Sequence, residues 1–197
     1  MSSPFLSVII PAFNEEIRIG RTLTAVMQYL RSYNWEWEVV VADDGSTDAT
    51  ATIVADFGSQ DPRVRLLQLQ HGGKGWAVRH GMMHAQGEYR FLCDADLSMP
   101  IQHLASFLPP ALNDFDVAIG SREAPGARRL NEPWIRHFSG KLFNILVRLI
   151  AVHGISDSQC GFKCFRAPAA EQLFSFQKST GFSFDAEVLF IAQRLGM

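Results

Sequence analysis

The chain has 197 residues, of which 47% are hydrophobic and 19% are charged, as is ordinary for a globular protein. This length allows one sizeable core, so we expect a single domain spanning residues 1–197. The net charge of −2, with no zinc-finger spacing and no arginine-rich tail, argues against nucleic acid as a partner.

The first segments of the chain show a strand pattern followed by a helix pattern. Residues 1–16 have neither a basic flank nor a small-residue cleavage site, so we expect no signal peptide. Residues 6–11 predict a strand, and Asn14 is placed to cap a helix that runs to about Arg31. One face of this helix is formed by Ile17, Thr22, Leu23, Val26, Met27 and Leu30.

The same unit recurs along the chain. Further strands are predicted at residues 38–43, 64–69, 89–94 and 115–120, and further helices at 48–57, 76–85 and 102–112. Parallel neighbouring strands need crossover connections, which helices usually supply. The alternation therefore predicts an α/β fold with a mostly parallel twisted sheet and helices on both faces.

Cysteine usage and hydropathy bear on the cellular compartment of the protein and on whether it crosses a membrane. Cys93, Cys160 and Cys164 are odd in number and lack paired C-x-x-C spacing, which argues against a disulfide framework and a structural zinc site. Reduced thiols favour a cytoplasmic location. The apolar stretch at residues 142–152 is well short of the roughly 20 residues that span a bilayer, so we expect no membrane-crossing segment.

Polar clusters follow all five predicted strands. In an open sheet of this kind, ligands bind outside the carboxyl ends of the strands. Any one cluster could be a solvated turn or a helix cap, and Asn14 and Ser46 suit capping in either case. Five clusters at one edge favour a binding site instead. They read PAFNEE, DDGSTD, GGKG, DADLS and GSR.

The cluster DADLS contains two carboxylates separated by one residue. If strand geometry persists, Asp94 and Asp96 leave the chain on the same face, where they suit Mg²⁺ or Mn²⁺ together with diphosphate oxygens. The run Gly72 to Gly75 could bring backbone and the Lys74 ammonium close to an anion, although it is not a P-loop pattern. Hydrogen-bond acceptors at a strand end, such as the Asp43 carboxylate, suit binding of a nucleotide base or a ribose hydroxyl.

Five segments carry a resemblance by their order and spacing: SVIIPAFNEE, VVVADDGSTDAT, GGKGWAVRHGM, YRFLCDADLSMP and VAIGSR. Together they resemble the family 2 glycosyltransferases of the GT-A fold, which use nucleotide-diphosphate sugars. The later segments SDSQCGFKCFR and FSFDAEVL look most like the branch of dolichyl-phosphate β-glucosyltransferases, with polyprenyl-phosphate mannosyltransferases as close relatives. The resemblance implies a nucleotide-sugar half at residues 1–120 and an acceptor half at 121–197.

The resemblance also implies roles for individual residues. Asp94 and Asp96 would be the DxD metal ligands, with Ala95 between them at the nucleotide sugar. Lys74 would lie near the nucleotide phosphates. The remaining nucleotide contacts would be the pocket residues Pro11, Ala12, Asn14 and Glu15, and the uracil and ribose contacts Asp43 and Asp44.

The chain departs from the relatives at two points. Ser98 stands where mannosyltransferase relatives often have a glutamine metal ligand, so Ser98 is only a candidate ligand and the base specificity stays open. The sequence also stops at GFSFDAEVLFIAQRLGM, where such proteins usually continue. It could be a fragment or a short member.

The acceptor side has a local excess of basic residues. Residues 122–148 contain six lysines and arginines against two glutamates. With the amphipathic stretch after it, this region suits an anionic head group on an apolar tail at a membrane surface, although a solvated face on a core helix is the alternative. By resemblance, Arg122 and Arg136 would hold a lipid phosphate; Arg128 and Arg129 are less certain.

The resulting hypothesis is inverting, metal-dependent transfer of glucose from UDP-glucose to a polyprenyl phosphate at the cytoplasmic face of a membrane. A phosphate acceptor is already ionised near neutral pH, whereas a hydroxyl acceptor would need a general base. Asp157 is expected to organise the acceptor loop, and Asp185 and Glu187 suit either such a base or a helix cap. The alternatives are transfer to a saccharide hydroxyl and a non-catalytic nucleotide-binding module.

Overall fold

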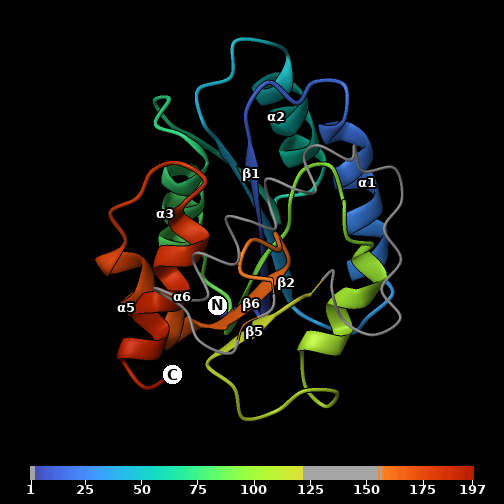
Figure 1. The fold of residues 1–197 in the computed structure, drawn as a ribbon. Helices are drawn as coiled ribbons and strands as arrows, with labels where there is room; N and C mark the ends of the chain where they lie inside the picture. Colours follow the sequence, from blue (N-terminus) through green and yellow to red (C-terminus); the bar gives the residue numbers. More distant parts are fainter. Residues whose placement is uncertain (1–2, 122–154, 156) are drawn as a thin grey trace, which may run out of the picture.

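The computed structural model describes residues 3–121, 155 and 157–197 (Figure 1). Its strands are β1 Leu6–Ala12, β2 Trp37–Asp43, β3 Val64–Gln68, β4 Tyr89–Leu92, β5 Val117–Ile119 and β6 Lys163–Arg166. Its helices are α1 Ile19–Leu30, α2 Thr50–Gln60, α3 Lys74–His84, α5 Ala167–Phe176 and α6 Phe184–Arg194, with the 3-10 helix η1 at Ile101–Phe107. Among the described helices, none combines the length and hydropathy needed to cross a bilayer.

The six strands form one sheet in the order β3-β2-β1-β4-β6-β5. The pairs β1·β2, β1·β4 and β2·β3 are parallel, whereas β6 is antiparallel to both β4 and β5. Strand β5 therefore runs in the same direction as β1, and the carboxyl ends of all five predicted strands lie at one edge. The prediction of a mostly parallel sheet is confirmed, but β6 was not predicted, because the short run KCFR with its charged ends gives no alternation to detect.

Apolar side chains cover both faces of the sheet. Along β1, Val8 and Ile10 pack in one buried cluster with residues of α1 and η1. Ile9 points the other way and packs in a second cluster with residues of α3, α5 and α6. Figure 1 shows these helices on opposite sides of the strands, which confirms the prediction of a sheet covered on both faces.

The first helix begins later than the sequence predicts. Asn14 has a left-handed backbone with φ of 54°, and α1 starts at Ile19, so Asn14 does not cap it. Ile17 is 82% exposed and Ile19 takes its place in the core. Ser46 is not a helix cap either, since its hydroxyl donates to the Asp43 carboxylate. Both side chains instead join neighbouring loops, which local capping rules do not reveal.

The predicted helix at residues 102–112 is also wrong in type and length. The structure has the 3-10 helix η1, which ends at Phe107. Pro109 and Pro110 follow closely, and proline supplies no backbone N–H to continue a helix. This segment packs through Ile101 and Leu104 on the α1 face of the sheet.

A buried carboxylate joins strands at the amino edge of the sheet. Glu38 is 4% exposed, and its carboxylate accepts hydrogen bonds from the Ser7 hydroxyl at 2.6 Å and the backbone N–H of Gln86 at 2.6 Å. Arg65 completes the group with an ion pair of 2.6 Å to Glu38. The group lies at the end of the sheet opposite to the polar clusters, where it joins the second residues of β1, β2 and β3 to the loop before β4.

Asp61 is expected to make stability depend on acid pH. Hydrogen bonds from Arg63, opposed by desolvation and assisted by Arg31, hold the pKa of Asp61 well below its ordinary value. A depressed carboxyl pKa contributes stability above the unfolded value of about 3.9, and this contribution is lost as the pH falls further. Asp61→Asn should therefore flatten the loss of unfolding free energy below about pH 4, measured by urea denaturation. An unchanged pH slope in the variant would contradict this assignment.

Candidate active site

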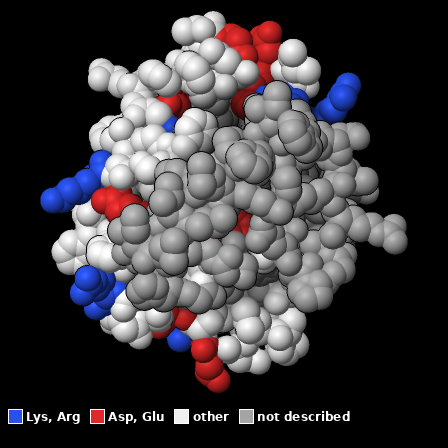
Figure 2. All heavy atoms as spheres, viewed as in Figure 1, with Lys and Arg blue, Asp and Glu red and all other residues white. Residues whose placement is uncertain are grey.

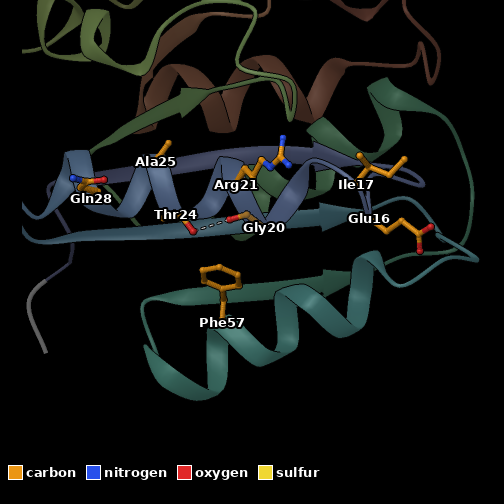
Figure 3. A pocket seen from close by; sticks show the side chains of 8 residues that line it. All are labelled: Glu16, Ile17, Gly20, Arg21, Thr24, Ala25, Gln28 and Phe57. Atoms are coloured by element: carbon orange, nitrogen blue, oxygen red, sulfur yellow. Dashed lines mark hydrogen bonds between the residues drawn. The ribbon is translucent and has the colours of Figure 1, made fainter.

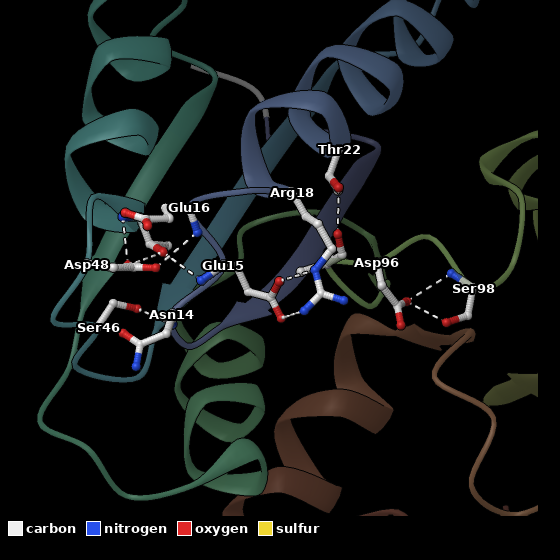
Figure 4. Close-up of polar contacts among 11 residues, drawn as sticks. Asn14, Glu15, Glu16, Arg18, Thr22, Ser46, Asp48, Asp96 and Ser98 are labelled. Atoms are coloured by element: carbon white, nitrogen blue, oxygen red, sulfur yellow. Dashed lines mark hydrogen bonds and ion pairs between the residues drawn. The ribbon is translucent and has the colours of Figure 1, made fainter. Parts of the chain in front are cut away.

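The loops after β1 and β2 are joined by hydrogen bonds at the carboxyl edge of the sheet (Figure 4). The backbone N–H of Asn14 donates to the Ser46 hydroxyl at 2.9 Å, and the amide oxygen of Asn14 accepts from the Thr47 N–H at 2.9 Å. The Glu15 N–H donates to the Thr50 hydroxyl at 2.7 Å. These bonds fix the relative position of two of the five predicted clusters.

The structure brings the other residues predicted on the β1 loop to the same place. Pro11 and Ala12 are buried at the end of β1, and the Ala12 carbonyl accepts a hydrogen bond from the Asp44 N–H at 2.8 Å. Glu15 binds the Arg18 guanidinium through both carboxylate oxygens, at 2.7 and 3.1 Å. In Figure 4 this pair lies between the labelled Asn14 and Ser46 on one side and Asp96 on the other. A direct nucleotide contact by these residues stays a prediction.

Asp44 fixes the loop that precedes α3. Its side chain is 3% exposed and accepts hydrogen bonds from the N–H groups of Gly72 and Gly73 at 2.8 and 2.9 Å. His71 Nδ1 lies 2.9 Å from the same carboxylate. Because a carboxylate has about four acceptor positions, most of the capacity of Asp44 is used within the protein. Asp43 is similarly engaged with Ser46, so base or ribose binding by either aspartate stays a prediction.

The glycines of the GGKG loop allow close packing against residues 179–181. A Cβ atom on Gly73, whose φ is 101°, would lie 2.7 Å from the Thr180 carbonyl oxygen. A Cβ atom on Gly75 would lie 2.6 Å from the Ser179 carbonyl oxygen. The side-chain amide of Gln177 also donates to the Gly75 carbonyl at 2.9 Å. The glycines thus hold α3 and Lys74 against the segment that leads into α6.

Asp94 and Asp96 lie in a turn just beyond β4, which ends at Leu92. The Asp94 side chain is 28% exposed, and its Oδ1 lies 2.7 Å from Lys74 Nζ. That oxygen is buried, and the Lys74 ammonium is the charged group in contact with it. Asp96 is exposed and accepts hydrogen bonds from the Ser98 N–H at 2.9 Å and the Ser98 hydroxyl at 2.5 Å. Ser98 therefore orients Asp96.

Ala95, between the two carboxylates, ties the turn to α1. Its side chain is 5% exposed, and its carbonyl accepts a hydrogen bond from the Thr22 hydroxyl at 2.5 Å (Figure 4). Thr22 is itself buried on the face of α1 that the sequence predicts. The turn that presents Asp94 and Asp96 is therefore anchored to a helix on one face of the sheet and to Lys74 of α3 on the other.

This turn suits a divalent cation that also binds substrate oxygens. Within the described ranges, no three His, Cys, Asp or Glu side chains gather into a complete metal-binding group. Two carboxylates are nevertheless enough for Mg²⁺ or Mn²⁺ when diphosphate oxygens and water supply the remaining ligands. The partly exposed carboxylate of Asp94 and the exposed carboxylate of Asp96 fit that donor set.

Lys74 places a positive charge beside this turn. Burial disfavours its charge, but the carboxylates of Asp94, Asp185 and Asp96 outweigh burial and raise the pKa of Lys74 above its ordinary value. Asp185 is 4% exposed, and its carboxylate lies 2.5 Å from Lys163 Nζ. An ammonium held beside two carboxylates could bind the phosphates of a nucleotide, as the sequence predicts.

The other two carboxylates predicted after the DxD turn have different environments. Glu187 accepts hydrogen bonds from the N–H groups of Lys178 and Ser179, at 3.0 and 2.7 Å, and so holds the loop before α6. Asp157 is buried at 2% exposure, shortly before β6. Its predicted role in acceptor binding stays a prediction. Neither Asp185 nor Glu187 caps α6 through a side-chain hydrogen bond.

Three aromatic side chains at the site were missed by sequence reasoning. The Phe13 ring, 44% exposed, stacks on the His71 ring with 4.4 Å between centroids. Phe182 is 74% exposed, and its ring centroid lies 5.8 Å from Lys74 Nζ. An apolar residue inside a polar cluster, as in PAFNEE, was the available signal for Phe13. His71 and Phe182 gave no such signal, because their partners lie far away in the sequence.

Several predicted acceptor residues lie outside the described residues, namely Arg122, Arg128, Arg129 and Arg136. On the described part of the face in Figure 2, lysine and arginine side chains are dispersed among other residues. The predicted acceptor region therefore stays a prediction.

A pocket of about 560 Å³ lies elsewhere, along α1 (Figure 3). Its wall includes Ile17, Arg21 and Gln28, together with Phe57 of α2. It shares none of its lining residues with the DxD turn or the GGKG loop. The candidate site is thus defined by converging polar side chains rather than by this pocket.

Comparison with known protein families gives a match over most of the chain. The profile described as "Glycosyl transferase family 2" matches residues 7–174. Dolichyl-phosphate beta-glucosyltransferase ALG5C of Trichomonas vaginalis is 38% identical over 98% of this chain and 60% of its own length. Dolichyl-phosphate beta-glucosyltransferase of Homo sapiens is 33% identical over 95% of this chain and 63% of its own. The chain thus spans about three fifths of the length of these curated relatives.

Solved structures share the fold at lower identity. Glucosyl-3-phosphoglycerate synthase from Mycobacterium tuberculosis, crystallised with Mn²⁺, UDP-glucose and phosphoglyceric acid, superposes with a TM-score of 0.70. It is 18% identical, and the match covers 98% of this chain and 66% of the synthase chain. Mannosyltransferase PcManGT from Pyrobaculum calidifontis, in complex with GDP-mannose and Mn²⁺, is 22% identical with a TM-score of 0.51, over 88% of this chain and 47% of its own.

Proposed function

Because the chain belongs to glycosyl transferase family 2, we propose that it transfers glucose from UDP-glucose to a polyprenyl phosphate such as dolichyl phosphate. The observation that carries the proposal is the turn with Asp94 and Asp96 next to Lys74, at the carboxyl edge of the sheet. Sequence relatives named for this reaction match nearly the whole chain, which favours the glucosyl donor and the lipid acceptor.

In this proposal, Asp94 and Asp96 hold a divalent cation, and Lys74 contacts the diphosphate of the donor. The cation, Mg²⁺ or Mn²⁺, would supply positive charge that stabilises the departing diphosphate. Lys74 of α3 supplies a second, fixed positive charge beside this turn, because its ammonium is held against Asp94. Ser98 keeps the Asp96 carboxylate oriented toward the turn.

The acceptor phosphate attacks the anomeric carbon on the side opposite the leaving diphosphate, which inverts the configuration of the sugar. A phosphate monoester is largely ionised near pH 7, since its second pKa is about 6. The reaction therefore needs no protein general base. Arg122 and Arg136 are proposed to hold this phosphate, and Asp157 to organise the loop around it. The apolar tail of the acceptor favours a membrane surface, and the buried cysteines Cys93 and Cys164, which form no disulfide, favour its cytoplasmic face.

The test is a transfer assay with the chain, Mn²⁺, labelled UDP-glucose and dolichyl phosphate. We expect label in the lipid extract, dependent on Mn²⁺ and absent after chelation. Label found only on saccharide acceptors would overturn the lipid phosphate as acceptor. Metal-dependent UDP binding without turnover on any acceptor would instead indicate a nucleotide-binding module. A parallel assay with Mg²⁺ and with GDP-mannose decides the metal and the donor.

The Phe13 ring is proposed to stack on the nucleotide base. Base stacking on an aromatic side chain contributes about 1–3 kcal/mol, so Phe13→Ala should weaken UDP binding by about tenfold. Calorimetric titration of UDP with Mn²⁺ measures the change. Phe176→Ala is the matched control, because Phe176 is also exposed, at 55%, and lies at the end of α5. Equal affinities for the two variants would show that the Phe13 ring is not the base platform.

A further inference from the structure

A buried ion pair lies beneath the DxD turn and has no part in the proposed chemistry. Lys163 and Asp185 have side-chain exposures of 1% and 5%, and Lys163 Nζ lies 2.5 Å from Asp185 Oδ1. The same ammonium donates to the Cys160 carbonyl oxygen at 2.5 Å. Burying two charges is costly, and well-packed apolar side chains often give equal or greater stability. A gain in stability is therefore a weak explanation for this pair.

The pair connects strand β6 to the position of Asp94. Lys163 begins β6 and pairs with Leu92, the last residue of β4, two residues before Asp94. Gly161 lies between Lys163 and Cys160, and a Cβ atom on Gly161 would overlap the carboxylate of Asp94. The backbone at residues 160–161 therefore forms a wall against the Asp94 carboxylate. Lys163 holds this wall through the Cys160 carbonyl, and Asp185 holds Lys163.

The charges around Asp94 agree with this connection. From α3, Lys74 contacts Asp94 directly, and it also interacts with Asp185. Burial raises the pKa of Asp185, and the ammonium of Lys163 opposes that effect. Each aspartate thus has a lysine as its ion-pair partner. Lys74 of α3 pairs with Asp94 after β4, and Lys163 of β6 pairs with Asp185 of α6.

We propose that Lys163 and Asp185 are positioning residues, which fix the Cys160–Gly161 backbone against Asp94 and so hold that carboxylate ready for a divalent cation. This inference rests on the proposed function, because it assumes that Asp94 is a metal ligand. Residues that orient metal ligands typically change metal affinity by about 10–100-fold when they are replaced.

The test measures Mn²⁺ binding directly, by electron paramagnetic resonance and by calorimetry in the presence of UDP. The double variant Lys163→Met/Asp185→Asn removes both charges, so that no buried charge is left without a partner. We expect it to fold and to bind Mn²⁺ with UDP about tenfold more weakly than the unaltered chain. Asp185→Asn alone keeps an acceptor for Lys163 and should weaken binding less than the double variant does, but by more than about twofold.

The matched control is the double variant Arg65→Met/Glu38→Gln, which removes another ion pair, at the opposite edge of the sheet. It should lower thermal stability without changing the Mn²⁺ affinity. A Lys163→Met/Asp185→Asn variant with Mn²⁺ affinity within about twofold of the unaltered chain would overturn the inference. If this double variant does not fold, Asp185→Asn decides by the same criterion. Failure of the unaltered chain to bind Mn²⁺ with UDP would instead overturn the proposed function.

Discussion

Asp96→Asn is expected to lower metal-dependent glucosyl transfer by about a thousandfold, since a metal ion stabilises charge in the transition state by several kcal/mol. Asparagine keeps the volume of aspartate and an oxygen that can accept the hydrogen bonds from Ser98. The change thus removes one negative charge from the turn and little else. Asp96 is exposed, so the unfolding free energy should stay within about 0.5 kcal/mol.

Initial rates with UDP-glucose over a range of Mn²⁺ concentrations measure this effect, and circular dichroism during heating measures stability. Asp56→Asn is the matched control, because Asp56 is an exposed aspartate on α2 outside the site. It should transfer glucose at the rate of the unaltered chain. A rate for Asp96→Asn close to that of Asp56→Asn would show that Asp96 is not a ligand of the catalytic metal.

Lys74→Met is expected to lower kcat/KM for UDP-glucose by about a hundredfold, as loss of one charge-stabilising donor commonly does. Methionine has a similar length but no charge, so the diphosphate loses a cation and Asp94 loses the partner at 2.7 Å. Because the pKa of Lys74 is raised, the ammonium stays charged up to and beyond the ordinary lysine range. The contribution of Lys74 should therefore be constant through neutral and mildly alkaline pH.

Steady-state kinetics at several pH values, together with UDP titrations, test this prediction. Lys178→Met is the control, since Lys178 is an exposed lysine on the loop before α6. The control should leave kcat/KM unchanged. If Lys74→Met binds UDP with unaltered affinity and turns over normally, the proposed contact with the diphosphate is wrong.

The sheet could be predicted from the sequence because its first four strands are short β-branched or apolar runs, each followed by a helix pattern. The shared edge followed from the handedness and direction of such connections, and the structure confirms it through the parallel pairs and the direction of β5. Asp94, Asp96 and Lys74 were predicted as one group on this basis, and the ion pair between Lys74 and Asp94 brings two of them into contact.

The rest depended on contacts between residues that are distant in the sequence. Asn14 carries the local signature of a cap, but its side chain accepts a hydrogen bond from the β2 loop. In the sequence, Asp44 looks available to bind a substrate. In the folded chain, two N–H groups of the GGKG loop donate hydrogen bonds to its carboxylate. The ion pair of Lys163 with Asp185 needs β6 and α6 to be assembled, so no local pattern could have revealed it.

The place of β6 in the sheet has a consequence for the order in which the chain can assemble. Chains emerge amino terminus first during synthesis, so β1 to β4 can pair while β5 still has no neighbour. Until Lys163–Arg166 arrives, the strand Tyr89–Leu92 lacks its antiparallel neighbour, and an unpaired strand edge is a site to which a second chain could add. The strand that fills this edge also completes the wall against Asp94, so the sheet gains its missing neighbour and the site its backbone wall in the same step.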